Sequence, residues 1–269
     1  MINFPQGKIN LGLNIIAKRP DGYHNLETCF YPVGLTDILE IIPAQETSFA
    51  HSGLVVSGSA EENLCLKAYR VLKNDFGMGN VNMHLHKIIP MGAGLGGGSS
   101  DGAATLLMLN EIFELNISKT ELEKYASLLG SDCAFFIGNE AKFAEGRGEI
   151  LSPIELNLKN LFLVLVKPDV HISTAEAYAK IELSKPEHTI PQILKLPVQQ
   201  WKNHLVNDFE KNIFRKYPVI GSIKEKFYSL GAVYASMTGS GAAVYGIFEK
   251  PIDLKSEFSG FFYWGEVLK

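Results

Sequence analysis

The glycine run at residues 90–100 constrains this chain more than any other part of its sequence. The run reads PMGAGLGGGSS and has five glycines in the seven positions 92–98. Only glycine lets successive backbone amides turn inward around an anion without obstruction by side chains. The alternating stretch 81–86 predicts a strand before the run, and the apolar stretch 103–115 predicts a buried helix after it. A strand, a glycine loop and a helix N-terminus favour phosphate binding, with a hinge or tight turn as the alternative.

Two commoner phosphate motifs do not fit this run. A Walker A loop needs a lysine before its serine, but Gly98 stands before Ser99. Residues 92–97 match GxGxxG, yet about 20 residues later Glu111 and Glu114 lie in a helical pattern, where a dinucleotide fold has an acidic residue at the end of a strand. The loop has no lysine of its own, so the cation that a bound phosphate requires must come from elsewhere in the chain.

Lys8 and Asp132 are the candidates for the charged groups of phosphoryl transfer, which needs a cation and a base beside the acceptor hydroxyl. Lys8 and Asn10 share the polar face of an alternating strand whose other face is apolar, although a surface lysine on an edge strand would look the same. Asp132 lies between Gly130 and the apolar residues 133–136, which suits a general base or, alternatively, a helix N-cap. His84 and His86 share a strand face but lack a third ligand at matching spacing, so we interpret them as structural.

Composition and charge limit the classes of partner. With 269 residues, 46% of them hydrophobic, the chain can form one large or two modest domains, and we predict a boundary near Pro153, with domains at 1–153 and 154–269. A net charge of -4 argues against nucleic acid or an acidic membrane as a partner. Three widely spaced cysteines, no signal-peptide pattern and no apolar run of ~20 residues indicate a cytoplasmic protein with no membrane contact.

Four stretches of the sequence resemble the motifs of the GHMP small-molecule kinases. They are GKINL at 7–11, DGYH at 21–24, the glycine run extended to residue 104, and TGSG at 238–241. They follow the order of the family, and the resemblance covers nearly the whole chain, thinly between 181 and 230. It implies an α+β, two-domain GHMP kinase fold. The N-terminal domain would be ribosomal S5 domain 2-like, and the C-terminal domain would be ferredoxin-like and complete the substrate cleft.

The resemblance also implies a reaction and the residues that perform it. Asp132 would act as general base on an alcohol that is phosphorylated by ATP, and Lys8 would neutralise charge. Mg²⁺ would be carried by ATP, without a confident protein ligand. The residues matching ATP-binding positions are Pro90, Met91, Gly92, Ala93, Gly94, Leu95, Gly96, Gly97, Gly98, Ser99 and Ser100, with Asn63 and Lys87 for the adenosine part.

The substrate that the resemblance implies is a small-molecule cytidyl diphosphate. Asn10 would hydrogen-bond it, Tyr23 and Tyr178 would stack on the cytosine ring, and His24 would read the edge of that ring. The turn with Gly239 and Ser240 matches a family motif that packs against the site. A monomer or weak homodimer is expected.

Departures from the family pattern leave two alternatives open. The family usually has Ala or Ser where this chain has Gln6 and Gly7, and more often Phe where it has Tyr178. Another GHMP kinase, acting on mevalonate, homoserine or a sugar, would share the glycine loop but would not need the DGYH turn. A non-catalytic ligand sensor of the same fold would not need Lys8 and Asp132 together.

Overall fold

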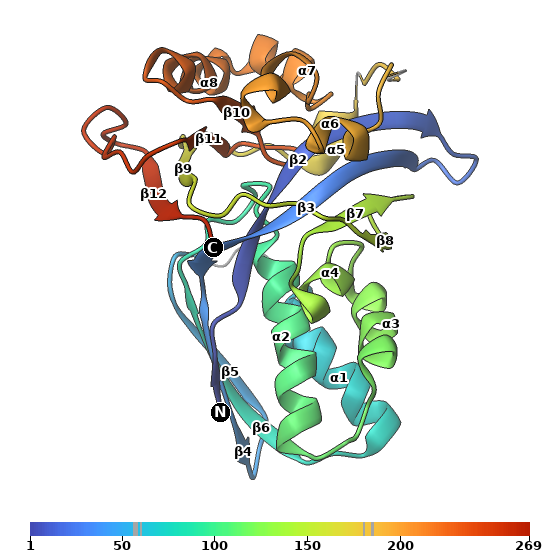
Figure 1. Cartoon of the computed structure of the whole chain (residues 1–269). Coiled ribbons are helices and arrows are strands. Elements are labelled where there is room, and N and C mark those ends of the chain that lie inside the picture. Colours follow the sequence, from blue (N-terminus) through green and yellow to red (C-terminus); the bar gives the residue numbers. More distant parts are fainter. Residues whose placement is uncertain (56–58, 60, 180, 184–185) are drawn as a thin grey trace. The chain divides into compact units, whose positions relative to one another are not determined.

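The computed structural model describes residues 1–55, 59, 61–179, 181–183 and 186–269, which form two compact units (Figure 1). The first unit comprises Met1–Lys8, Leu35–Met91 and Gly96–Glu140, and the second comprises Ile9–Gly34, Gly92–Leu95 and Ala141–Lys269. The two units therefore alternate along the chain. The single domain boundary near residue 153 stays a prediction.

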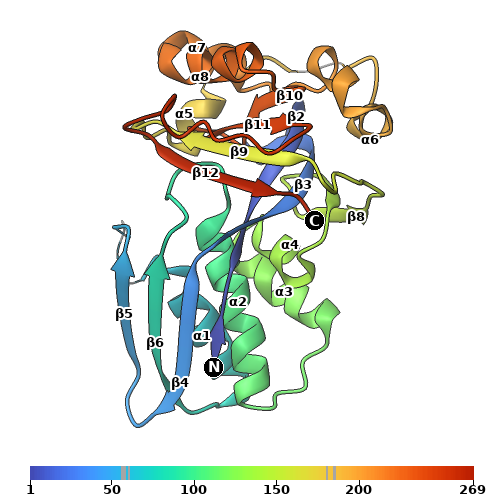
Figure 2. The ribbon, with the colours of Figure 1, turned by 60° about the vertical axis from the view of Figure 1, so that its left-hand side comes forward.

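The first unit is a sheet with helices packed on one face. Its sheet has the order β1-β4-β6-β5, with β5 parallel to β6 and the other pairs antiparallel. The strands are β1 (Ile2–Asn3), β4 (Ile38–Ala44), β5 (Ser48–Gly53) and β6 (Asn80–Lys87). The helices are α1 (Leu64–Phe76), α2 (Gly97–Ile112), α3 (Lys119–Leu129) and α4 (Cys133–Gly138). Buried and exposed side chains alternate along β6, and Figure 2 shows α1 and α2 behind the sheet, so the core of this unit lies between them.

The predicted strand, loop and helix are confirmed, but both bounds of the helix differ: α2 ends at Ile112, before the predicted residue 115. The strand is β6, but α2 begins at Gly97, inside the glycine run, six residues before the apolar stretch from which the helix was predicted. The predicted capping box is also present: the hydroxyl of Ser118 accepts from the backbone of Glu121, and the Glu121 side chain accepts from the backbone of Ser118. Helix α3 ends at the predicted Gly130.

The second unit contains two four-stranded sheets. The first has the order β10-β11-β9-β12 and is antiparallel throughout. Its strands are β9 (Phe162–Lys167), β10 (Tyr234–Met237), β11 (Val244–Phe248) and β12 (Phe262–Val267). Strand β9 lies between β11 and β12, which confirms the central strand predicted at 161–166. The second sheet has the order β2-β3-β7-β8, from β2 (Gln6–Lys18), β3 (His24–Thr36), β7 (Lys142–Glu145) and β8 (Ile150–Pro153).

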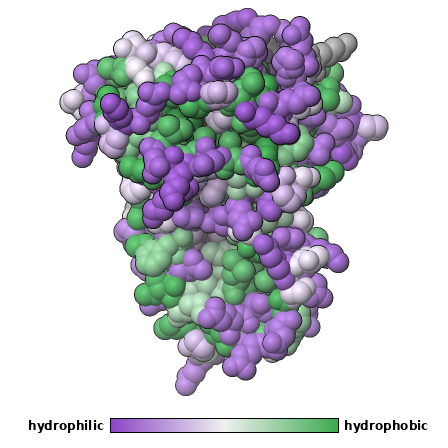
Figure 3. All heavy atoms as spheres, in the orientation of Figure 1, coloured by the Kyte–Doolittle hydropathy of each residue, from purple (hydrophilic) through white to green (hydrophobic). Residues whose placement is uncertain are grey.

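Short helices complete the second unit. They are α5 (Thr174–Tyr178), α6 (Ile190–Leu194), the 3₁₀ helix η1 (Val198–Asn203), α7 (Glu210–Lys216) and α8 (Pro218–Ser229). The apolar side of α8, with Ile220, Ile223 and Phe227, packs into the core that β9, β10 and β11 supply. In Figure 3 the outer surface of α7 and α8 is mostly hydrophilic, as expected for helices with one buried side.

Strand β2 differs from its sequence-based description. The prediction of one buried and one polar, open face was wrong, because residues 7–15 are buried on both faces. The polar face can be buried because its side chains have partners: Lys8 forms an ion pair with Asp132, and Asn10 hydrogen-bonds to Thr28.

In the part of the chain that the structure describes, no helix combines the length and apolar character needed to cross a bilayer.

Candidate active site

Lys8 and Asp132 lie together in the first unit. The Lys8 Nζ is 3.5 Å from Oδ2 of Asp132; the lysine is 3% exposed, whereas 30% of the Asp132 side chain is exposed. Asp132 precedes α4 with α-helical backbone angles, and its side chain makes no capping hydrogen bond. Asp132 thus occupies the N-cap position of α4, as the alternative expected, but its carboxylate does not cap the helix. The carboxylate is paired with Lys8 while it keeps an open side.

Burial lowers the pKa of Lys8, and the charge of Asp132 and a hydrogen bond to that carboxylate oppose the shift. A buried ammonium loses hydration that one partly exposed carboxylate does not fully replace. The positive charge of the Lys8 ammonium would attract a second anion placed beside it. The pair thus suits a step in which negative charge arrives or develops next to an alcohol.

Gly96 brings the end of the glycine run against this pair. It precedes α2 with φ +69°, and a β-carbon there would lie 2.8 Å from Cζ of Phe136 and 3.2 Å from Cε of Lys8. Glycine is required both for the positive φ and for this close approach. The free N–H groups at the start of α2 are therefore held near the Lys8 side chain, where they favour an anion.

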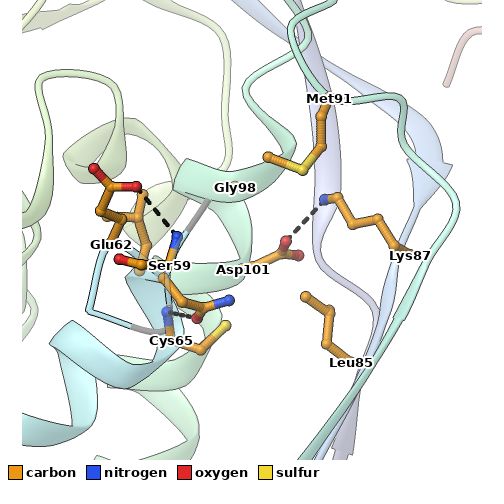
Figure 4. Close-up of a pocket in the computed structure, with 10 residues that line it drawn as sticks. Ser59, Glu62, Cys65, Leu85, Lys87, Met91, Gly98 and Asp101 are labelled. Carbon is orange, nitrogen blue, oxygen red and sulfur yellow. Dashed lines mark hydrogen bonds and ion pairs between the residues drawn. The ribbon is translucent and has the colours of Figure 1, made fainter. Parts of the chain in front are cut away.

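A pocket of about 150 Å³ lies beside the start of α2 (Figure 4). It is lined by Ser59, Glu62, Asn63, Leu64, Cys65, Leu85, Lys87, Met91, Gly98 and Asp101. Four of these, Asn63, Lys87, Met91 and Gly98, were predicted to bind ATP, and the structure brings them together. Oδ1 of Asn63 caps α1 by accepting from the backbone N–H groups of Cys65 (2.9 Å) and Leu66 (3.3 Å).

Lys87 points into the protein rather than toward solvent. Its ammonium donates to Oδ2 of Asp37 and, at 2.8 Å, to Oδ2 of Asp101, and it is 2% exposed. Sequence reasoning missed both aspartates. Asp101 directly follows the glycine run and could have been considered from that position, whereas no local signal marks Asp37, which is 50 residues before Lys87.

The other loop residues of the first unit are packed in the fold. Pro90 and Ser100 are buried, and Gly97 contacts the side chain of Lys87 so closely that a β-carbon would lie 2.8 Å from Nζ. The hydroxyl of Ser99 hydrogen-bonds the thiol of Cys133, whose pKa burial raises to about 12. That thiol is therefore protonated at neutral pH and not a nucleophile.

The middle of the glycine run, residues 92–95, belongs to the second unit. There the hydroxyl of Thr238 donates to the carbonyl of Gly94 (3.0 Å), and the carbonyl of Ala93 accepts from the N–H of Ala243 (3.2 Å). A β-carbon on Gly92 would lie 2.7 Å from Nδ1 of His171, and Leu95 is buried. The run thus lies against the TGSG turn that the sequence singled out.

Asn10 is fixed beside the same turn. Its Nδ2 donates to the hydroxyl of Thr28 (2.9 Å), and its backbone N–H donates to the hydroxyl of Thr238 (3.0 Å). Gly239 approaches Gly94 so closely that a β-carbon would lie 3.1 Å from the Gly94 Cα, while Ser240 is half-buried. The predicted residues Asn10, Gly94 and Gly239 therefore meet in the second unit.

Two further side chains support this region and were missed from the sequence. Nδ2 of Asn207 donates to the carbonyls of Met237 (2.8 Å) and Gly239 (2.9 Å), which holds the turn. Thr28 accepts from Asn10 and donates to the carbonyl of Gly12 at 2.6 Å. Neither lies in a recognisable motif.

The two tyrosines predicted to stack on the substrate have different neighbours in the structure. The Tyr178 ring stacks on His24, with centroids 4.9 Å apart and planes 21° apart, and meets Phe209 edge to face at 4.9 Å. Tyr23 is 58% exposed, and the guanidinium of Arg147 lies 5.1 Å from its ring centroid. Tyr23, His24 and Tyr178 are thus all in the second unit, and Arg147 is a neighbour that the sequence did not indicate.

His84 and His86 do share a face of β6, as their spacing predicted. The hydroxyl of Ser52 lies within hydrogen-bonding distance of both rings, 3.1 Å from Nε2 of His84 and 2.9 Å from Nδ1 of His86. Among the described residues, no three His, Cys, Asp or Glu side chains converge as a metal site would require.

Comparisons with known proteins complete the description of the site. The GHMP kinases N terminal domain matches residues 63–139, and the GHMP kinases C terminal domain matches residues 194–262. A Bacteroides thetaiotaomicron protein named 4-diphosphocytidyl-2-C-methyl-D-erythritol kinase is 55% identical over 253 residues, 93% of this chain and 92% of its own. The crystal structure of a 4-(cytidine 5'-diphospho)-2C-methyl-D-erythritol kinase has a TM-score of 0.84 and 30% identity, covering 98% of both chains. A Methanococcus jannaschii mevalonate kinase has a TM-score of 0.73 at 15% identity, over 100% of this chain and 98% of its own, and is alike in fold alone.

Proposed function

Because the chain belongs to the GHMP kinases, in the family of the 4-diphosphocytidyl-2-C-methyl-D-erythritol kinases, we propose that it transfers the γ-phosphate of ATP to the 2-hydroxyl of 4-diphosphocytidyl-2-C-methyl-D-erythritol. This reaction lies on the non-mevalonate route to isoprenoid precursors. Family membership confirms the predicted α+β GHMP kinase fold and the predicted class of ATP-dependent small-molecule kinase.

The ion pair of Lys8 and Asp132 is the observation that carries the proposal. Asp132 accepts the proton of the acceptor hydroxyl as its oxygen bonds to the γ-phosphorus, and the bond from that phosphorus to the ADP oxygen breaks. Lys8, whose ammonium is 3.5 Å from Asp132, attracts the negative charge that gathers on the transferring group. The open side of the Asp132 carboxylate leaves room for the alcohol.

The adenosine part of ATP is proposed to enter the pocket of Figure 4. Leu64, Leu85 and Met91 offer apolar surface to a base, and the amides of residues 90–100 with the α2 N-terminus offer donors to the phosphates. Mg²⁺, bound to the phosphates, neutralises part of their charge. We propose that this ion enters with ATP.

The cytidyl substrate is proposed to use the polar and aromatic residues of the second unit. Asn10 supplies hydrogen bonds to it, and Gly239 and Ser240 line its site. His24 and Tyr178 already form a stacked pair, while the exposed ring of Tyr23 is open to a further stacking partner. We also propose that the protein acts in the cytoplasm as a monomer or weak homodimer, without nucleic acid or membrane partners.

A panel of acceptors tests the proposed reaction. ADP release from ATP and Mg²⁺ should be fast with 4-diphosphocytidyl-2-C-methyl-D-erythritol and at background with mevalonate, homoserine and galactose. Cytidine monophosphate should compete with the first substrate. Faster release with another acceptor would assign the chain to a different GHMP kinase activity, and release with none would favour the ligand sensor.

Asp132→Ala tests the proposed base. Turnover should fall at least ~10²-fold, because the acceptor proton then has no positioned acceptor. The affinity for ATP should change less than about threefold, since a base acts on the alcohol. Rates should be compared with calorimetric ATP titrations, and full activity in the variant would remove Asp132 from this role.

A further inference from the structure

The two ends of the glycine run, which has no lysine of its own, are held by charged side chains. Lys87, Ile88 and Ile89 come directly before the run, and Asp101 comes directly after it. Both ends lie in the first unit. Asp37, from elsewhere in the chain, contacts the segment before the run, and Lys87 joins Asp37 to Asp101.

Asp37 uses both carboxylate oxygens in this contact. Its Oδ1 accepts from the backbone N–H groups of Ile88 (2.6 Å) and Ile89 (2.8 Å), and its Oδ2 accepts from the Lys87 ammonium. The same ammonium donates to Asp101 Oδ2 at 2.8 Å, the interaction that is dashed in Figure 4. Hydrogen bonds between charged partners are about twice as strong as neutral ones.

This group of three side chains is buried almost completely. Asp37 is 0% exposed, Lys87 is 2% exposed and Asp101 is 3% exposed. An isolated charge at such depth is costly. Removing one partner of a buried ion pair is therefore strongly destabilising, because it leaves the other charge unpaired. The three side chains are therefore held in one arrangement, and the backbone bonded to Asp37 is held with them.

The charge balance is unequal, with two carboxylates for one ammonium. Cys65 is a further titratable neighbour of the group, and burial raises its pKa to about 12. Oδ1 of Asp101 has no hydrogen-bond partner in the described part of the chain and is buried. The ammonium of Lys87 already has two carboxylate partners, whereas the lysine of a Walker A loop binds phosphate.

We propose that Asp37, Lys87 and Asp101 form a clamp that positions the glycine run for the phosphates of the nucleotide, with Asp37 as its central positioning residue. The inference rests on the proposed function, since it assumes that residues 90–100 bind a nucleotide. Asp37 acts through the backbone of Ile88 and Ile89 and through Lys87. It touches neither the reacting atoms nor the nucleotide.

Asp37→Asn tests the clamp with little change in shape. The variant keeps one carbonyl oxygen for the backbone N–H groups but loses the charge that holds Lys87. Calorimetry should compare two ligands, a non-hydrolysable ATP analogue and adenosine, which lacks phosphates. We expect at least a tenfold loss of affinity for the analogue and less than a threefold loss for adenosine.

The comparison of the two ligands separates positioning from a general loss of structure. A merely structural defect would weaken both ligands equally, and that result, or an unchanged affinity for the analogue, would overturn the clamp. If the unaltered protein binds neither ligand, the proposed function fails instead. Rates in the variant should show a raised KM for ATP with KM for the cytidyl substrate within twofold.

A surface aspartate serves as the control, and a second clamp variant serves if the first does not fold. Asp75 accepts a hydrogen bond from the Tyr125 hydroxyl on the surface of the same unit (2.7 Å), so Asp75→Asn should leave both affinities unchanged. If Asp37→Asn does not fold by circular dichroism, Asp101→Asn removes one clamp carboxylate and leaves the bonds of Asp37. It should weaken the analogue at least threefold more than it weakens adenosine, whose proposed pocket Asp101 also lines, and equal effects on the two ligands would contradict the clamp.

Discussion

At Lys8 the proposed catalytic role and the stability of the fold oppose each other. Burial lowers the pKa of Lys8, so the folded state holds this proton less tightly than the unfolded state. The charged side chain therefore costs folding free energy at every pH below its folded-state pKa. Asp132 is partly exposed and can be hydrated without its partner.

We expect Lys8→Met to be more stable and much slower. Removing the buried ammonium should raise the free energy of unfolding by ~1 kcal/mol, a rise of about 2–4 °C in Tm. Loss of the cation should lower turnover at least ~10²-fold. Thermal unfolding and ADP release measure the two effects. Lys124→Met, an exposed lysine on α3, is the control and should change neither quantity.

Asp101 makes stability depend on pH in a predictable direction. Burial raises the pKa of Asp101 to about 7, although Lys87 opposes the shift. The unfolded state releases this proton near pH 4, roughly the ordinary value for Asp, so between the two values the folded state binds more protons. The free energy of unfolding therefore falls as pH rises through that window.

Asp101→Asn should flatten this dependence. Urea unfolding at pH 5, 6, 7 and 8 should show a smaller decrease in the variant than in the unaltered protein, because the amide does not titrate. Asp75→Asn, which removes an exposed carboxylate, should keep the original slope. Identical slopes for the unaltered protein and Asp101→Asn would show that Asp101 is already ionised at pH 5.

Local patterns predicted some of these residues and not others. Alternation in β2 indicated Lys8, and the Gly130 stop indicated Asp132, because each signal lies within a few positions of the residue. Their pairing came from the resemblance to the GHMP kinases. Asp37 was missed because its partners are 50 residues away, and an Asp after a strand-like segment has no distinctive spacing.

At the scale of elements, the start of α2 depends on a glycine with no room for a side chain. A β-carbon on Gly97 would lie 2.8 Å from Lys87 Nζ and 2.9 Å from Cγ2 of Ile89. A lysine at the end of a flexible chain could usually move away. Here its ammonium is held by two buried carboxylates, so the contact is not easily relieved.

Gly97→Ala and Gly98→Ala form a matched pair. Alanine is favoured over glycine by up to ~1 kcal/mol in a helix interior, and Gly97 and Gly98 are the first two residues of α2, so helix propensity alone predicts that both changes stabilise the helix by less than this. Gly98 has open space at its β position and should follow that prediction. Gly97→Ala should instead lower the free energy of unfolding by roughly 1–3 kcal/mol through overpacking. Equal gains in chemical unfolding experiments would contradict the tight contact.

Elements with strong local signals were predicted best. The capping box of α3, the alternation of β6 and the apolar run of β9 each determine an element within its own residues. Burial of both faces of β2 could not be predicted, because period-two alternation normally reports one wet face. The polar face of β2 is buried because side chains distant in sequence form hydrogen bonds and ion pairs with its polar groups.

At the scale of the whole molecule, the sequence predicted the class of fold, and the structure adds a division into two compact units that alternate along the chain. Strands β2 and β3 lie near the N-terminus, yet most of their residues belong to the second unit. A composition-based boundary assumes one cut in the chain, whereas here the chain passes between units several times. Each crossing of the chain from one unit to the other depends on long-range contacts, and a single sequence contains no local signal for such contacts.

The cap at Asn63 determines the chemical polarity of one side of the pocket. Two backbone N–H groups of α1 hold its amide oxygen, so the amide turns its NH₂ end away from the helix. That end can give a proton to a ligand lone pair but can never receive one. Serine, threonine or aspartate would begin α1 equally well, yet each would exchange this amide donor for a different group on the pocket wall.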